Sequence, residues 1–110
     1  MIEDDIRLIL KTLLEKSKAK QIIWTPFEDS EVDLDDDYVV SFPMSSVNVF
    51  KNQQGAVRVN ILNSTGTVVG SLSSESELDR RLLQELLDCA KESVFKIDET
   101  LQDLKRALAS

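Results

Sequence analysis

The chain has 110 residues, of which 42% are hydrophobic and 30% are charged, with a net charge of −7. This is the size and composition of one folded domain, which excludes a disordered chain and a chain with two cores. The run EDSEVDLDDD, Glu28 to Asp37, holds seven of the 20 acids and no base, so the rest of the chain is balanced at 13 acids and 13 bases. Because no basic stripe remains, nucleic-acid binding is disfavoured.

Several features favour a cytoplasmic location. No apolar run approaches the roughly 18 residues that a membrane-spanning helix needs. The N-terminal stretch MIEDDIRLIL has an acidic head, whereas a secretory signal has a basic one. The single cysteine, Cys89, cannot form an internal disulfide, and its place beside Ala90 is typical of a small core residue.

The first expected element is a helix over Ile2 to Lys18, with acids at its head and lysines at its tail. Its apolar residues share one face: Ile2, Ile6, Ile9, Leu10, Leu13 and Leu14. The β-branched and aromatic run QIIWT, Gln21 to Thr25, predicts a short strand that ends at Pro26.

The middle of the chain predicts an antiparallel meander. Alternating apolar and polar residues indicate strands at Tyr38 to Phe42, Ser46 to Phe50, Ala56 to Leu62 and Thr67 to Leu72. The glycine-containing turns Asn52 to Gly55 and Asn63 to Gly66 separate the last three. Connections this short join antiparallel neighbours, because a parallel crossover needs a dozen residues or more.

A long amphipathic helix is expected after Ser74, which with Glu77 fits a capping box. Its stripe recurs every three or four residues at Leu78, Leu82, Leu86, Ala90, Val94, Ile97, Leu101, Leu104 and Leu108. One straight helix of this length spans about 50 Å, and a six-residue strand only about 20 Å. The helix therefore either breaks near Ser93 to Asp98, or its end extends past the sheet.

The predicted fold is thus α+β: an N-terminal helix, a four- to five-stranded antiparallel meander and a long C-terminal helix, both helices on one face of the sheet. We expect a single domain over 1–110, with an acidic loop at 28–37 and a possible helical extension at 98–108. If the helix does not break, we expect a second chain to cover Leu101, Leu104 and Leu108. An isolated subunit in which these three residues are exposed to water would contradict that expectation.

Few residues favour an enzyme. Histidine is absent, which removes the commonest general base and zinc ligand. The three glycines are scattered among turn and strand positions, so no phosphate-binding loop is formed. We expect no catalytic residues and no cofactor.

The acidic run is the one chemically unusual segment. Asp33, Asp35 and Asp37 alternate like the start of a calcium loop, but Tyr38 and Met44 stand where that loop has its glycine and its glutamate. A solvated loop is favoured over weak metal binding. The third alternative is a surface for a basic partner, formed by Glu28, Asp29, Glu31, Asp33, Asp35, Asp36 and Asp37.

Trp24 is a candidate interaction residue if it is exposed, although packing against a helix is favoured for a tryptophan in this setting.

The leading helix, IIWT, SVNVF, the hairpin VRVNILNSTGTVVGSL and LDRRLLQELLDCAKES resemble a group of small bacterial proteins with the same element order and no established activity. The resemblance implies a fold and a bacterial origin. The order is also similar to frataxin-like proteins and secretion chaperones, but no motif matches residue by residue, and the acids lie in a loop rather than on the first helix and strand edge.

The function expected from the sequence is a non-enzymatic protein–protein interaction or oligomerisation module, self-associating as a homodimer through its C-terminal helix. The alternatives are an acidic inhibitor or chaperone that binds a basic protein, and a weak metal carrier that uses the acidic loop. No membrane partner is expected.

Overall fold

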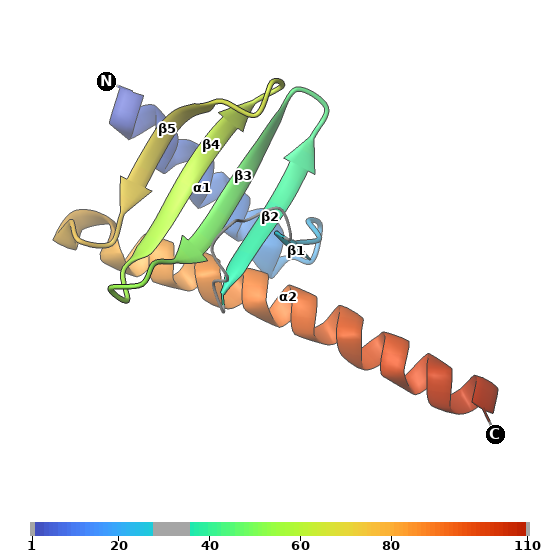
Figure 1. Ribbon diagram of the computed structural model, residues 1–110. Coiled ribbons are helices and arrows are strands. Elements are labelled where there is room, and N and C mark those ends of the chain that lie inside the picture. Colours follow the sequence, from blue (N-terminus) through green and yellow to red (C-terminus); the bar gives the residue numbers. More distant parts are fainter. Residues whose placement is uncertain (1, 28–35, 110) are drawn as a thin grey trace.

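Figure 1 shows the computed structural model of the chain, in which residues 2–27 and 36–109 are described. Its elements are α1 (Ile2–Lys18), β1 (Thr25–Pro26), β2 (Asp37–Phe42), β3 (Ser45–Lys51), β4 (Val57–Asn63), β5 (Val68–Ser73) and α2 (Glu77–Ala109). The strands form one sheet in the order β1-β2-β3-β4-β5, and every neighbouring pair is antiparallel. The predicted α+β meander between two helices is confirmed.

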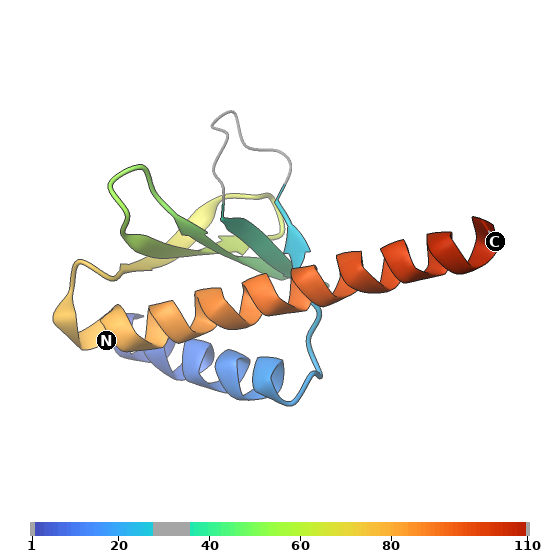
Figure 2. The same cartoon turned by 90° about the horizontal axis from the view of Figure 1, so that it is seen from below.

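Both helices lie on the same face of the sheet, as Figures 1 and 2 show from two directions. α1 packs against β5 and α2, and α2 crosses under all five strands. The core between the layers consists of buried apolar side chains from both helices, from β2 to β5 and from Trp24 just before β1: Ile6, Leu10, Leu13, Leu14, Trp24, Tyr38, Val40, Val47, Val49, Val57, Val59, Leu72, Leu83, Leu86, Leu87 and Ala90. Burial of this apolar surface is the main stabilising contribution to the fold.

The register of the strands follows the alternation of apolar and polar residues along the sequence. Val49 pairs with Val59, and Val59 with Leu72, so these side chains form one apolar row beneath the helices. Arg58 and Asn60 point to the opposite face, where Arg58 is exposed. A slip by one residue would exchange the two faces, so the apolar pattern fixes the register.

The two predicted turns are confirmed and have the same construction. The Asn52 side-chain oxygen accepts hydrogen bonds from the backbone N–H of Gln54 and Ala56, and the Asn63 side chain does the same for residues 65 and 67. Gly55 and Gly66 have φ angles of +85° and +82°, which residues with a Cβ rarely adopt.

The predicted strand at Gln21 to Thr25 is wrong in its bounds, because only Thr25 and Pro26 pair with β2. The backbone N–H of Trp24 donates instead to the hydroxyl of Ser93 on α2. The indole is fully buried and donates to the hydroxyl of Ser17 on α1. This segment therefore crosses the helical layer before the chain joins the sheet edge, where a proline is tolerated.

The predicted capping box is also wrong. Ser74 extends the β4–β5 ladder, since its N–H donates to the Val57 carbonyl and its hydroxyl accepts from the Val57 N–H. The helix begins at Glu77 and continues without interruption to Ala109. The break expected as one alternative near Ser93 to Asp98 is absent, so the end of the helix extends past the domain (Figure 1).

The buried face of α2 differs from the predicted stripe in its first turn. Asp79 is only 2% exposed, and Leu83, Leu86, Leu87 and Ala90 continue from it, whereas Leu78 is 72% exposed. The Asp79 carboxylate accepts two hydrogen bonds from Arg7 of α1, from Nε at 2.7 Å and from Nη2 at 3.2 Å. In the first turn of α2, the inward-facing residue is thus Asp79, held by a bidentate ion pair, and not Leu78, which the hydrophobic pattern predicted.

Among the described residues, no helix combines the length and the apolar character that crossing a membrane requires.

We expect Arg7→Met to destabilise the fold, because it leaves the Asp79 carboxylate buried without its cation. The midpoint of urea unfolding should fall well below that of the control Asp4→Asn, which removes only an exposed ion pair with the same arginine. Arg7→Met with Asp79→Leu should recover part of the loss. Equal midpoints for Arg7→Met and Asp4→Asn would contradict a structural role for the buried pair.

Candidate interaction surface

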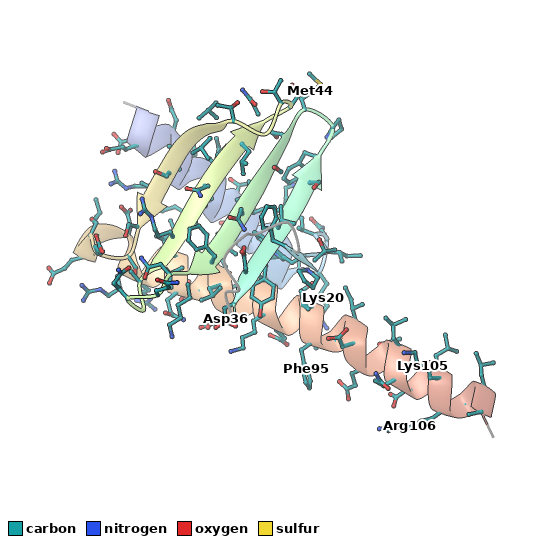
Figure 3. All side chains as sticks on the ribbon, in the orientation of Figure 1. Lys20, Asp36, Met44, Phe95, Lys105 and Arg106 are labelled. Atoms are coloured by element: carbon teal, nitrogen blue, oxygen red, sulfur yellow. The ribbon has the colours of Figure 1, made fainter. Side chains whose placement is uncertain are left out.

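The end of α2 extends beyond the rest of the described molecule. Every residue from Phe95 to Ala109 is exposed. The principal extents of the molecule are 56 × 29 × 29 Å, and this segment, here called the overhang, accounts for the long dimension. Figure 3 shows Phe95 where α2 leaves the domain, and Lys105 and Arg106 further along, where the picture draws no other helix or strand beside it.

The apolar residues of α2 repeat in steps of four and three along its whole length, at Leu83, Leu87, Ala90, Val94, Ile97, Leu101, Leu104 and Leu108. This is the spacing of the a and d positions of a heptad, with Leu83, Ala90, Ile97 and Leu104 at d. The same side of the helix therefore begins in the core of the domain and continues onto the overhang. We call its last part, Ile97, Leu101, Leu104 and Leu108, the seam.

No described residue of the single chain covers the seam. The exposed fraction rises along it, from 37% at Ile97 to 49% at Leu101, 54% at Leu104 and 78% at Leu108. The predicted residues Leu101, Leu104 and Leu108 are thus brought together on one face, and Ile97, absent from that prediction, belongs with them. The seam does not fold back onto any described part of the domain. Leu101, Leu104 and Leu108 are therefore bare in this single chain, which is the outcome named from the sequence as contradicting the expectation of a covered extension. Cover by a second chain stays a proposal.

Charged and small residues flank the seam on different sides. Asp98 and Lys105 follow d positions and occupy the e positions, whereas Ser93, Thr100 and Ala107 occupy the g positions. One flank therefore carries one charge of each sign, and the other is small and uncharged. Phe95 is exposed but lies at a b position, outside the seam.

The acidic residues predicted as an interaction surface lie largely outside the described residues, which omit Glu28, Asp29, Glu31, Asp33 and Asp35. The two that are described are engaged within the fold. Asp36 accepts a hydrogen bond from the Tyr38 hydroxyl at 3.1 Å and lies 3.5 Å from Lys91 of α2. Asp37 accepts from the Asn48 amide at 2.6 Å. Partial burial raises the pKa of Asp37, while the Asn48 hydrogen bond acts against this rise.

Across residues 2–27 and 36–109, no cluster of three or more cysteine, aspartate or glutamate side chains has an arrangement that could hold a metal ion. Of the aspartates weighed as metal ligands, Asp33, Asp35 and Asp37, only Asp37 falls in these ranges.

Trp24 does not belong to a binding surface. Its side chain is fully buried, with the indole N–H donating to Ser17 at 3.0 Å. Trp24 packs inside the domain, as the sequence favoured. The alternative, in which Trp24 is an exposed aromatic anchor for a partner, is wrong.

Cys89 is half-buried at the base of the overhang and lines a 300 Å³ hollow with Ile22, Ile23 and three lysines. Burial raises the pKa of its thiol, and nearby carboxylates add to the rise against the effect of Lys18. A thiol in this state is a weak nucleophile.

A second apolar surface was not anticipated from the sequence. Ile9, expected on the buried face of α1, is exposed, and it lines an open groove with Leu8 and Phe42. The buried arc of α1 is narrower than predicted, because α2 and β5 contact only one side of it. Nothing in the fold identifies an occupant of this groove.

Comparisons with protein-family models, with curated proteins and with solved structures found no match to this chain.

Burial, with Asp36 close by, raises the pKa of Tyr38 to about 12. Because Tyr38 is the only tyrosine of the sequence, absorbance at alkaline pH measures this value directly. The folded state keeps the phenol proton to higher pH than the unfolded chain, whose value is near 10.0. Stability should therefore fall as the pH rises between these two values, and Tyr38→Phe should lose that part of the pH dependence. A midpoint near 10 in the folded protein would contradict the burial of this hydroxyl.

Proposed function

We propose that this chain is a non-enzymatic self-association module, which forms a homodimer by pairing the seams of two overhangs. The proposal rests on the apolar heptad pattern, which continues past the edge of the domain onto a helical segment that no described residue covers. Soluble monomers rarely expose a contiguous apolar stripe, and a stripe with heptad spacing is typical of helix pairing.

The helical conformation of the overhang supports the same proposal. Isolated helices shorter than about 12–15 residues are marginal in water, and most helical stability in proteins comes from packing of the apolar face. The domain supplies a helical start for the overhang, but the leucines of its last turns, Leu101, Leu104 and Leu108, are exposed. A partner on the seam would provide the missing packing.

The size of the seam limits the affinity. The seam is only about two heptads long. Pairing two seams therefore buries less surface than the roughly 1,200–2,000 Å² that stable protein complexes bury. We therefore propose a concentration-dependent dimer with a Kd on the order of micromolar rather than a permanent one.

We also propose a bacterial cytoplasmic location. An unpaired and partly buried Cys89 is consistent with a reducing compartment.

The direct test replaces the central leucines by Leu101→Gln and Leu104→Gln together. Glutamine keeps helix propensity and length but removes apolar surface. Burying the remaining surface of a half-exposed leucine is worth about 1 kcal/mol, so the change of two leucines in each of two chains should weaken dimerisation about a thousandfold. Sedimentation equilibrium over a concentration series measures the association constant.

The matched control is Glu99→Gln with Arg106→Gln, which changes two exposed f positions of the same segment and should leave the association constant unchanged. Circular dichroism checks that both variants keep their helix. A wild-type chain that stays monomeric up to millimolar concentration, or a leucine variant that dimerises like the control, would overturn the proposal.

A further inference from the structure

We infer that the two overhangs pair in the antiparallel sense, with Leu101 of one copy against the partner's Leu104 and Asp98 beside the partner's Lys105. This inference rests on the proposed self-association and adds its orientation and register. It follows from the space around the seam and from the charges that flank it.

Space excludes the parallel arrangement. The seam lies on the side of α2 that, further back, packs against the domain's own sheet and α1 at Leu83, Leu87 and Ala90. Because α2 is one uninterrupted helix, a parallel partner helix would continue from the seam into the volume that this domain fills. Both chains would meet the same obstruction, and the shallow crossing of about 20° in helix pairs does not clear it over so short a segment.

The antiparallel arrangement avoids this obstruction. With Leu101 against the partner's Leu104, Ile97 lies against the partner's Leu108, and the pairing uses only the exposed overhang. The end of the partner helix then falls near Lys96, where the domain begins. A register shifted by one heptad toward the domain would place the partner's Leu108 beside Ala90, which is fully buried in its own core.

Charge favours the same orientation. In antiparallel helix pairs, e positions face e positions, so Asp98 of each chain lies near the partner's Lys105 and the complementary contact occurs on both sides of the symmetry axis. The opposite flank brings together Thr100 and Ala107, which are small enough for close approach. In the parallel arrangement Asp98 would face the partner's Ser93, and Lys105 would face its Thr100, so no opposite charges would meet.

Spin labels at two positions test the orientation. In a Cys89→Ala background, Asp88→Cys and Asp103→Cys each carry one label on an exposed position outside the seam. In the antiparallel dimer, labels at 103 lie side by side, whereas labels at 88 are separated along the helix axis by about 44 Å, at roughly 1.5 Å per residue. In a parallel dimer both pairs would lie at the same height and give similar short distances.

A short distance at 103 with a long distance at 88 supports the inference. Short distances at both positions, in a protein that sediments as a dimer, would overturn the orientation and leave the self-association intact. A protein that sediments as a monomer at the labelling concentration would overturn the proposed function, and this inference with it.

Charge reversal tests the register independently. Lys105→Glu should weaken the dimer about threefold to tenfold, because it places a like charge beside each Asp98, and Asp98→Lys added to it should restore the affinity. Arg106→Glu makes the same change of net charge at an f position and should have a smaller effect. Equal effects of Lys105→Glu and Arg106→Glu, or no recovery in the double variant, would contradict the contact between Asp98 and Lys105.

Discussion

A mismatch of length between the last helix and the sheet beneath it determines the shape of this molecule. The longest strands, β3 and β4, have seven residues each and span about 23 Å, whereas the 33 residues of α2 span about 50 Å. α2 contains neither glycine nor proline, the two residues that most strongly interrupt a helix, and it continues without a break. Half of its apolar face therefore packs in the core, and the other half extends past the domain with the same spacing.

The covered half of α2 is held firmly, which fixes the direction of the exposed half. Near its start, Asp79 receives two hydrogen bonds from Arg7 of α1. Close to the edge of the domain, Ser93 accepts a hydrogen bond from the Trp24 backbone, and Lys91 lies beside Asp36, the residue before β2. A helix anchored at both ends of its covered part presents the seam in one orientation, so little conformational freedom is lost when a partner binds.

Much of the fold could be predicted from local patterns. Alternation in Val57, Arg58 and Val59 gives the two faces of β4, and the positions of Gly55 and Gly66 give the turns. The errors occur where a tertiary contact overrides local preference. Trp24 lies in a run with high strand propensity, yet it packs between the helices and donates its backbone hydrogen bond to one of them.

The candidate surface, the seam, was also predictable in part from local patterns. The spacing of Leu101, Leu104 and Leu108 is visible in the sequence, and so is the excess of helix over sheet. Which residues of α2 enter the core is not visible, because Asp79 takes an inward position only in the presence of Arg7, 72 residues earlier. Nor does the sequence distinguish a helix that breaks at Ser93 from one that continues, since propensity differences there are small beside the packing of the covered half.

Amide hydrogen exchange of residues 97–109 at low and high protein concentration measures whether a second chain covers the seam. In the monomer this segment has backbone hydrogen bonds but no packing, so its amides should exchange nearly as fast as those of a marginal helix. On pairing, the amides of Leu101 and Leu104 should become protected as the concentration rises, while those of the core strands stay constant. Exchange in the overhang that is independent of concentration across the micromolar to millimolar range would contradict the account.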